Sequence, residues 1–185
     1  MAIGRSAAKV FMGQTRLNLN KVVALLADRD PYARGLVAQM LRGFGINSIL
    51  TADTGAQAKE LLALHRPDIA YIEGELPDMP AGELIVWIRR NANKALRQLP
   101  IIVLSGYTQM RVISAARDAG ANLVVKKPVS PQILFDRLAW AANSPRSFLE
   151  SGSYAGPDRR FHEVTTPGDK LHRQTDSPIP DIRQA

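Results

Sequence analysis

The segment Ile69-Ala70-Tyr71-Ile72-Glu73-Gly74-Glu75-Leu76-Pro77-Asp78-Met79-Pro80 decides the fold of this chain. Its first four residues form a short apolar run, which predicts a buried strand. Glu73 ends that run, and a turn-rich loop follows it. An acidic residue at the carboxyl end of a strand lies where open α/β sheets place their functional sites. Glu73 is therefore the first candidate site residue.

Apolar runs alternate with helical patterns through the middle of the chain. Between the runs, apolar residues recur at three- and four-residue steps, which indicates amphipathic helices. Five strand–helix units with right-handed crossovers predict a doubly wound α/β domain with a parallel sheet. The predicted strands are Val22–Ala27, Asn47–Leu50, Ile69–Ile72, Ile101–Leu104 and Leu123–Val125.

The two ends of the chain differ in composition from the middle. Residues 1–20 contain three basic residues and no acidic residue, which predicts a basic N-terminal extension. Residues 145–185 are rich in proline and glycine and lose the apolar periodicity. Such a segment buries too little apolar surface to offset the entropy of ordering, so we expect a flexible tail without an output domain. The expected domain is residues 21–144.

Composition excludes several classes of protein. The 185 residues carry a net charge of +7 without a basic cluster, so we expect no binding to DNA. The chain has no cysteine, which excludes disulfides and thiolate metal sites. No apolar stretch approaches the roughly 20 residues that a membrane span requires. We therefore expect no membrane span and a cytoplasmic location.

Short motifs follow one another at the ends of the predicted strands. Any one of them is a weak signal, but their order and spacing together are specific. Through them, residues 21–144 resemble the receiver domain of two-component response regulators, which implies a flavodoxin-like sheet of strand order 2-1-3-4-5. The motifs are Leu25-Leu26-Ala27-Asp28-Arg29-Asp30-Pro31, Pro67-Asp68, Pro77-Asp78-Met79 with Gly82, Pro100 to Gly106, and Lys127-Pro128 with Ser130-Pro131.

The resemblance also implies a phosphorylation pocket. In this family an acidic pair and an acceptor aspartate hold Mg²⁺, and a hydroxyl and a lysine contact the phosphoryl group. By position, Asp28 matches the first acid, Ser105 the hydroxyl and Lys127 the lysine.

Three positions depart from the family pattern. Arg29 replaces the second acid, and Glu73 replaces the acceptor aspartate. Val124 stands where the family has the aromatic residue that couples the pocket to the output face. The loop after Glu73 is one residue longer than expected. The chain is thus expected to be a degenerate, or pseudo-receiver, form.

These departures change the charge of the pocket. Asp28, Arg29, Glu73 and Lys127 sum to zero, whereas a typical receiver pocket is negative and attracts a divalent cation. Mg²⁺ requires carboxylate oxygens in a near-octahedral arrangement, and phosphoryl transfer depends on it. The longer Glu73 side chain shifts the oxygens by about 1 Å, which by itself can cost about 100-fold in rate. We therefore expect no Mg²⁺ cofactor and no efficient phosphorylation.

The expected function is signalling by protein–protein contact, independent of phosphorylation and without enzyme activity. The resemblance implies a contact face on the family's helix four, strand five and helix five, and partners such as a sensor kinase, another receiver, or a motor or polarity protein. Glu73 can form an ion pair with Lys127 or Arg29. That pair either holds one signalling state permanently or fills an inert pocket, and the sequence leaves both interpretations open.

Two alternatives remain. In the tail, Tyr154, Arg159 and Arg160 could stack on a base and pair with phosphate, which would make the protein an effector of a cyclic dinucleotide. The competing interpretation is a disordered tail or a peptide docked on its own domain. More remotely, Asp28-Arg29-Asp30 fits the Asp-x-Asp motif of haloacid-dehalogenase-type phosphatases, with the first aspartate as nucleophile.

Overall fold

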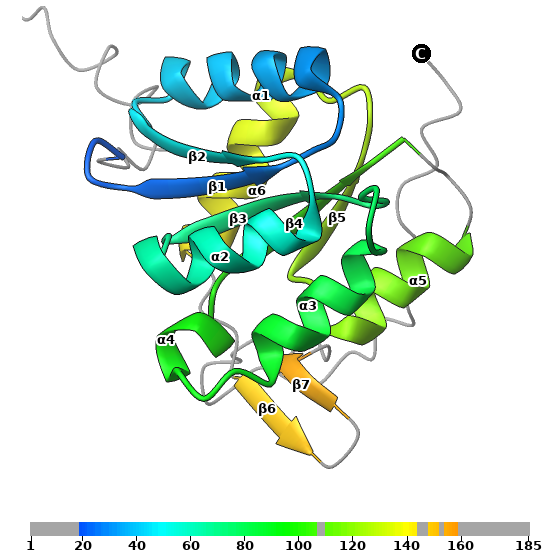
Figure 1. Ribbon diagram of the computed structural model, residues 1–185. Helices are drawn as coiled ribbons and strands as arrows, with labels where there is room; N and C mark the ends of the chain where they lie inside the picture. Colours follow the sequence, from blue (N-terminus) through cyan, green and yellow to red (C-terminus); the bar gives the residue numbers. More distant parts are fainter. Residues whose placement is uncertain (1–18, 107–109, 144–147, 152–153, 159–185) are drawn as a thin grey trace, which may run out of the picture.

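The computed structural model describes residues 19–106, 110–143, 148–151 and 154–158. Five parallel strands form one sheet in the order β2-β1-β3-β4-β5, which confirms the predicted topology (Figure 1). Two further strands form a separate antiparallel hairpin. The strands are β1 (Val23–Ala27), β2 (Ser48–Ala52), β3 (Ile69–Glu73), β4 (Ile101–Ser105), β5 (Leu123–Lys126), β6 (Phe148–Ser151) and β7 (Tyr154–Pro157).

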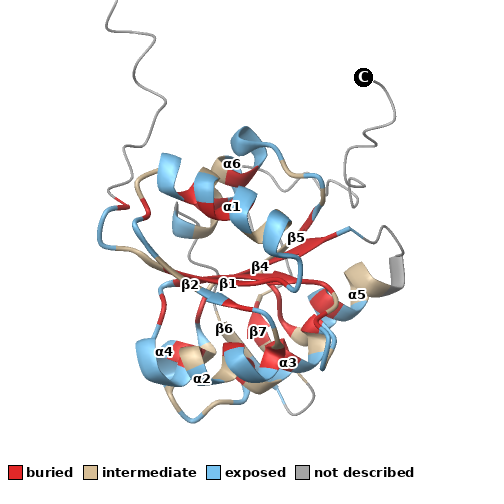
Figure 2. Cartoon of the chain, turned by 45° about the horizontal axis from the view of Figure 1, so that its top comes forward, coloured by how far each residue is buried: buried red, intermediate tan, exposed pale blue. Residues whose placement is uncertain are grey.

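Helices cover both faces of the sheet, so that the fold has three layers (Figure 2). Buried residues of α1 and α6 pack on one face, and those of α2, α3 and α5 pack on the other. The helices are α1 (Pro31–Gly43), α2 (Gly55–His65), α3 (Ala81–Arg89), α4 (Lys94–Arg97), α5 (Met110–Ala119) and α6 (Pro131–Asn143).

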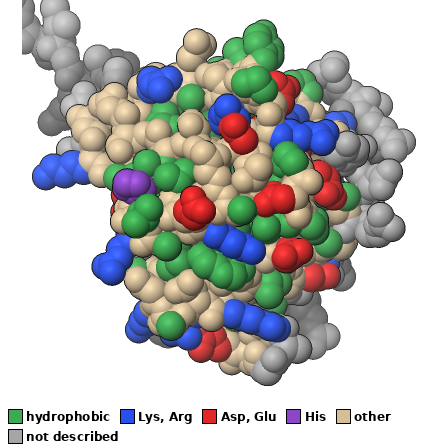
Figure 3. Space-filling model, viewed as in Figure 1, with side chains coloured by type: hydrophobic (Ala, Val, Ile, Leu, Met, Phe, Trp, Pro, Cys, Tyr) green, Lys and Arg blue, Asp and Glu red, His purple; other side chains and the backbone are tan. Residues whose placement is uncertain are grey.

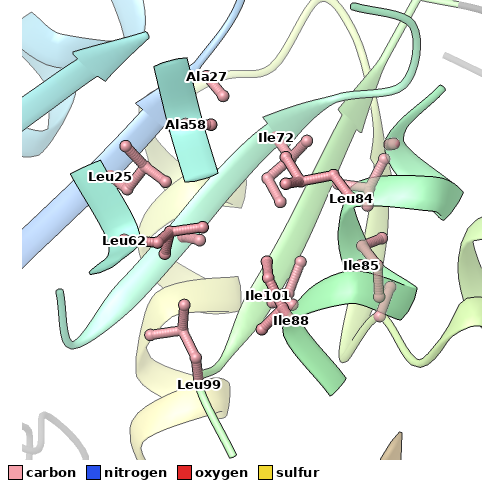
Figure 4. Close-up of a cluster of buried hydrophobic side chains, with 14 of the residues drawn as sticks. Leu25, Ala27, Ala58, Leu62, Ile72, Leu84, Ile85, Ile88, Leu99 and Ile101 are labelled. Carbon is pink, nitrogen blue, oxygen red and sulfur yellow. The ribbon is translucent and has the colours of Figure 1, made fainter. Parts of the chain in front are cut away.

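Alternate residues of each central strand enter opposite cores, because successive side chains of a strand point to opposite faces. In β1, Leu25 packs toward α2 and α3, whereas Leu26 packs toward α1 and α6. Figure 4 shows Ile72 of β3 beside Leu84 of α3 in the first of these cores. Both sides are buried, which explains why the strand segments are almost wholly apolar.

The second strand and the fourth helix correct the sequence-based boundaries. Strand β2 ends at Ala52 and not at Leu50, because its parallel pairing with β1 continues to that residue. The short helix α4 was not predicted. Asn93 begins it by accepting the backbone N–H groups of Ala95 at 3.0 Å and Leu96 at 3.5 Å, which is the chemistry of a helix N-cap.

The two predicted ends of the domain also need correction. Leu19, expected in the N-terminal extension, is buried in the core beneath α1 and α6. Strands β6 (Phe148–Ser151) and β7 (Tyr154–Pro157), expected in a flexible tail, pair as a hairpin, and β7 contacts α3 and α5. The composition argument counted only apolar burial. The hairpin docks through glycine contacts, an arginine and an ion pair, which such an argument does not detect.

Charged side chains of both signs are intermixed on the face shown in Figure 3. No helix within the described residues combines the length and the apolar character needed to cross a bilayer.

Candidate functional site

Four polar side chains lie at the carboxyl edge of the sheet, at the ends of neighbouring strands. Asp28 directly follows β1, and Lys127 directly follows β5. Glu73 and Ser105 are the last residues of β3 and β4. Because the carboxyl ends of parallel strands meet at one edge, residues distant in sequence come together here. The structure therefore assembles the four residues that the sequence indicated.

The centre of this site is the ammonium group of Lys127. Its Nζ atom donates to Asp28 Oδ2 at 2.6 Å and also to Glu73 Oε2. The side chains of Asp28 and Glu73 are 2% and 10% exposed, and that of Lys127 is 18% exposed. Of the two ion-pair partners that the sequence left open for Glu73, the structure thus selects Lys127. We call Asp28, Glu73 and Lys127 the lysine bridge.

Both carboxylates are fully engaged. The second oxygen of Asp28, Oδ1, accepts the backbone N–H of Asp30 at 2.9 Å. The second oxygen of Glu73, Oε1, accepts the backbone N–H of Gly74 at 3.1 Å. Each carboxylate therefore has one oxygen on Lys127 and one on a backbone amide.

This donor set does not fit the Mg²⁺ that the family resemblance implies. Mg²⁺ needs oxygen ligands in near-octahedral geometry, and here the lysine ammonium already holds one oxygen of each carboxylate. The position of the second acid is occupied by Arg29. Within the described residues, no group of three or more potential metal ligands is found.

The protonation of Lys127 follows from two opposing effects. Burial disfavours the charged ammonium, but the hydrogen bonds and negative charges of Asp28 and Glu73 outweigh burial, so the pKa of Lys127 is raised. A raised pKa in a lysine means that the ammonium group of Lys127 is charged at neutral pH. The lysine bridge itself has a formal charge of −1.

Arg29 lies at the rim of the site and not in it. Its side chain is exposed, and no ion pair to the lysine bridge is found in the described part of the chain. The sequence-based count of zero charge included Arg29, so the bridge is one charge more negative than that count. Val124 is partly buried and packs against the core of α2 and α3, where the family places an aromatic residue.

Ser105 lies beside the backbone of β3. Its side chain is buried, and a Cβ atom added to Gly74 would lie 2.7 Å from Ser105 Oγ. Only glycine therefore fits at position 74 without displacing the serine. The backbone oxygen of Ser105 also accepts the N–H of Lys127 at 2.8 Å, which joins β4 to the lysine bridge.

Sequence reasoning missed two supporting residues. Arg34 of α1 donates to the backbone oxygen of Asp28 at 2.6 Å and forms an ion pair with Asp53. Asp78 lies in the loop after Glu73 and accepts the backbone N–H groups of Gly55 and Ala56 at 2.7 and 2.8 Å. These hydrogen bonds lower the pKa of Asp78.

Asp78 thereby caps α2 from a distant loop and fixes the long loop that follows Glu73. That loop also closes on itself, because Leu76 donates its N–H to Met79 O at 3.1 Å. The motif Pro77-Asp78-Met79 was visible in the sequence, but its contact with α2 was not.

The remaining sequence candidates are placed as follows. Asp30 begins α1 by accepting the N–H of Tyr32 at 2.9 Å, so the acid that the phosphatase alternative needs is used as a helix cap. Tyr154 lies in β7, and its hydroxyl donates to Pro157 O at 2.8 Å. Arg159 and Arg160 lie outside the described residues, and the dinucleotide hypothesis stays a prediction.

A family model for the response regulator receiver domain matches residues 24–139. The chain belongs to this family. Chemotaxis protein CheY-3 from Vibrio cholerae is 29% identical over 122 residues, which cover 66% of this chain and 92% of that protein. Transcriptional regulatory protein PdtaR from Mycobacterium tuberculosis is 34% identical over 106 residues, which cover 57% of this chain. The matched part spans only 49% of the length of PdtaR.

Solved structures agree with the fold. A response regulator from Chloroflexus aurantiacus superposes with a TM-score of 0.61 at 26% identity, covering 65% of this chain and 96% of that one. The receiver domain of sensor histidine kinase PA1611 from Pseudomonas aeruginosa, solved with magnesium in its active-site cleft, gives a TM-score of 0.60 at 24% identity. Residues 24–139 thus form a receiver domain in both sequence and fold.

Proposed function

We propose that this receiver domain signals through protein contact without being phosphorylated, and that the lysine bridge holds it in one state. The observation that carries the proposal is the pair of contacts from Lys127 Nζ to Asp28 and Glu73. The three side chains that would have to rearrange around an incoming phosphoryl group are already bonded to one another. A paired, buried set of charges of this kind resists opening, because each partner would be left uncompensated.

Phosphorylation would require both a nucleophile and a metal. Glu73 has its two oxygens on Lys127 and on the Gly74 amide. Neutralisation of the developing charge by a metal is central to phosphoryl transfer, and the ligands for that metal do not assemble here. The loss of the aspartate nucleophile and the loss of the metal site reinforce each other. Restoring the nucleophile alone would leave the negative charge of the phosphoryl group without a metal to neutralise it.

The contact face that fits this function comprises α5, β5 and α6, which are the family's helix four, strand five and helix five. Ile133 on α6 is 43% exposed, an apolar side chain in the first turn of that helix. A sensor kinase, another receiver, or a motor or polarity protein would each meet the domain through such a face. PdtaR and CheY-3 are named for transcriptional regulation and chemotaxis, so the family relatives differ in output.

Labelling by acetyl phosphate in the presence of Mg²⁺ tests the absence of phosphorylation. We expect no covalent phosphate on the wild type by intact mass spectrometry. Glu73→Asp should restore little labelling, and the double variant Glu73→Asp, Arg29→Asp should restore more, because it replaces both the nucleophile and a metal ligand. Labelling of the wild type would overturn the proposal.

A Mg²⁺ titration followed by amide chemical shifts separates the two losses. The wild type should show no saturable shifts near Asp28 and Glu73 at millimolar Mg²⁺, and the double variant should show them. Full labelling of Glu73→Asp alone would mean that Arg29 does not block the metal.

Affinity capture tests the contact face. Ile133→Asp should reduce the recovery of specific partners, because a charge would then interrupt the apolar contact. Leu64→Asp is the matched control, since Leu64 is a 76% exposed apolar residue on α2, on the other face of the sheet. Equal loss in both variants would argue against this face.

A further inference from the structure

The β6–β7 hairpin lies against the ends of α3 and α5, near the amino ends of β4 and β5 (Figure 1). The surface beneath it includes Arg89 at the end of α3, Arg97 at the end of α4, and Gly120 just after α5. We call these three residues the docking groove. The groove lies at the opposite edge of the sheet from the lysine bridge.

Two glycines allow the closest approach between the hairpin and the groove. A Cβ atom on Gly156 of β7 would lie 2.9 Å from Gly120 Cα, and a Cβ atom on Gly120 would lie 2.6 Å from Ala155 O. Gly120 also has a φ of +107°, which favours glycine. The hairpin therefore fits only where both positions lack a side chain.

Charge and aromatic contacts fix the register of the hairpin in the groove. The guanidinium of Arg89 lies 5.9 Å from the ring centroid of Phe148, within the range of cation–π contacts. Arg97 Nη1 forms an ion pair with Glu150 Oε1 at 3.0 Å. The groove thus offers two cations, which meet one aromatic ring and one carboxylate of β6.

The hairpin does not fill the groove completely. A cavity of about 270 Å³ remains between the hairpin and the arginines, and its lining includes Arg90, Arg97, Ser151 and Tyr154. A lone two-stranded hairpin is marginally stable in water, so its folding depends on docking. A partly polar, incompletely packed contact of this kind is typical of reversible interfaces.

We propose that the docking groove is a peptide-binding site and that strands β6 and β7 are its exchangeable occupant in the same molecule. The matching ligand carries an aromatic residue over Arg89, a carboxylate facing Arg97 and a glycine against Gly120. A second copy of the chain or a partner with such a segment competes for the groove. The occupant contacts both α3 and α5 through β7.

The test uses the receiver domain without its hairpin. The structure of the Chloroflexus aurantiacus relative consists almost entirely of the matched fold, so residues 1–144 are expected to fold alone, which circular dichroism verifies. A fluorescent peptide of residues 146–160 should bind this shortened protein with micromolar affinity by anisotropy. The full chain should bind the same peptide at least about tenfold more weakly, because its own hairpin occupies the groove.

Matched peptides show whether the groove is the site. Gly156→Ala in the peptide should weaken binding at least about tenfold, since the added carbon would lie 2.9 Å from Gly120 Cα of the groove and 2.6 Å from Tyr154 Oη of the peptide. A peptide with the same residues in scrambled order is the matched control and should not bind. In the full chain, Gly156→Ala should release the groove and restore binding of the added peptide.

A charge exchange provides a second, independent measurement. Arg97→Glu in the shortened protein should weaken the parent peptide several-fold, and Glu150→Arg in the peptide should recover the loss. The proposal is overturned if a folded shortened protein does not bind the peptide. It is equally overturned if Gly156→Ala binds as well as the parent or if the charge exchange recovers nothing.

Discussion

Lys127, which is partly buried, and Arg89, which is buried, are cations at opposite edges of the sheet, and the protein compensates their charges in different ways. Lys127 meets two carboxylates, those of Asp28 and Glu73. Arg89, which is 2% exposed, has no ion pair among the described residues. Instead, it donates to four neutral oxygens: Gly120 O at 2.9 Å, Arg97 O at 2.7 Å, Leu99 O at 2.8 Å and Asn122 Oδ1 at 2.9 Å.

The difference separates a site held by formal charges from a site held by neutral hydrogen-bond acceptors. The lysine bridge is a set of formal charges at a partly open edge, so its stability depends on the protonation of its members. The Arg89 site joins α3, α4, β4 and β5 through dipoles that do not titrate. Burial lowers the pKa of Arg89 to about 10, so that its guanidinium remains charged at neutral pH.

The largest expected effect is that of Arg89→Met. The substitution removes four hydrogen bonds, each worth about 1 kcal/mol, so we expect a loss of about 4 kcal/mol in the free energy of unfolding. Urea unfolding measures the loss, which should be the same at about pH 5 and about pH 7 because no partner of Arg89 titrates there.

Two variants sharpen this prediction. Arg90→Met changes the neighbouring exposed arginine and should shift stability by no more than about 0.5 kcal/mol. Arg89→Lys keeps the charge but not the planar fork, so it should recover little. If Arg89→Lys restored full stability, charge and not hydrogen-bond geometry would be what the site requires.

A smaller and pH-dependent effect is expected for Lys127→Met. The substitution leaves Asp28 and Glu73 side by side without a cation, at an edge of the sheet that water can partly reach. We expect it to lower the free energy of unfolding by about 2 kcal/mol at neutral pH. Two like charges at close range repel each other, and a lower pH relieves this repulsion in the variant. The loss should therefore shrink between about pH 7 and about pH 5.

Urea unfolding at both pH values measures this contrast. Lys126→Met is the matched control, because Lys126 is the exposed neighbour on β5, and it should change little at either pH. A loss that stayed constant with pH would show that the lysine bridge is not held by charge, and the distinction from Arg89 would fail.

The sequence predicted one of these two sites and not the other. Lys127, Asp28 and Glu73 end strands whose order follows from apolar runs and turn motifs, so their meeting at one edge is a consequence of the parallel sheet. Arg89 is a basic residue in the last turn of a helix, which normally indicates a solvated residue favoured by the helix dipole. Its burial depends on Gly120, Asn122 and a hairpin about 60 residues further along the chain.

Sequence-based prediction missed the β6–β7 hairpin and the capping of α2 by Asp78 for the same reason. Propensity and periodicity report local preferences, and they reproduced the five-stranded sheet well. The contact of Gly156 with Gly120 and the capping of Gly55 by Asp78 join segments whose own patterns contain no sign of each other. Both depend on backbone groups, which are the same in every sequence.

Tyr71 supplies the third case, a buried polar group with no compensation. It lies in β3 within the core beneath α1 and α6, and its hydroxyl has no hydrogen-bond partner in the described part of the chain. Burial raises its pKa, which keeps the phenol neutral.

Tyr71→Phe removes the unpaired hydroxyl and should increase the free energy of unfolding by about 1 kcal/mol. Tyr32 is 75% exposed on the surface, so Tyr32→Phe should leave the free energy of unfolding unchanged. Urea unfolding compares the two variants, and a loss of stability in Tyr71→Phe would mean that an internal water satisfies the hydroxyl, as can occur at buried polar sites.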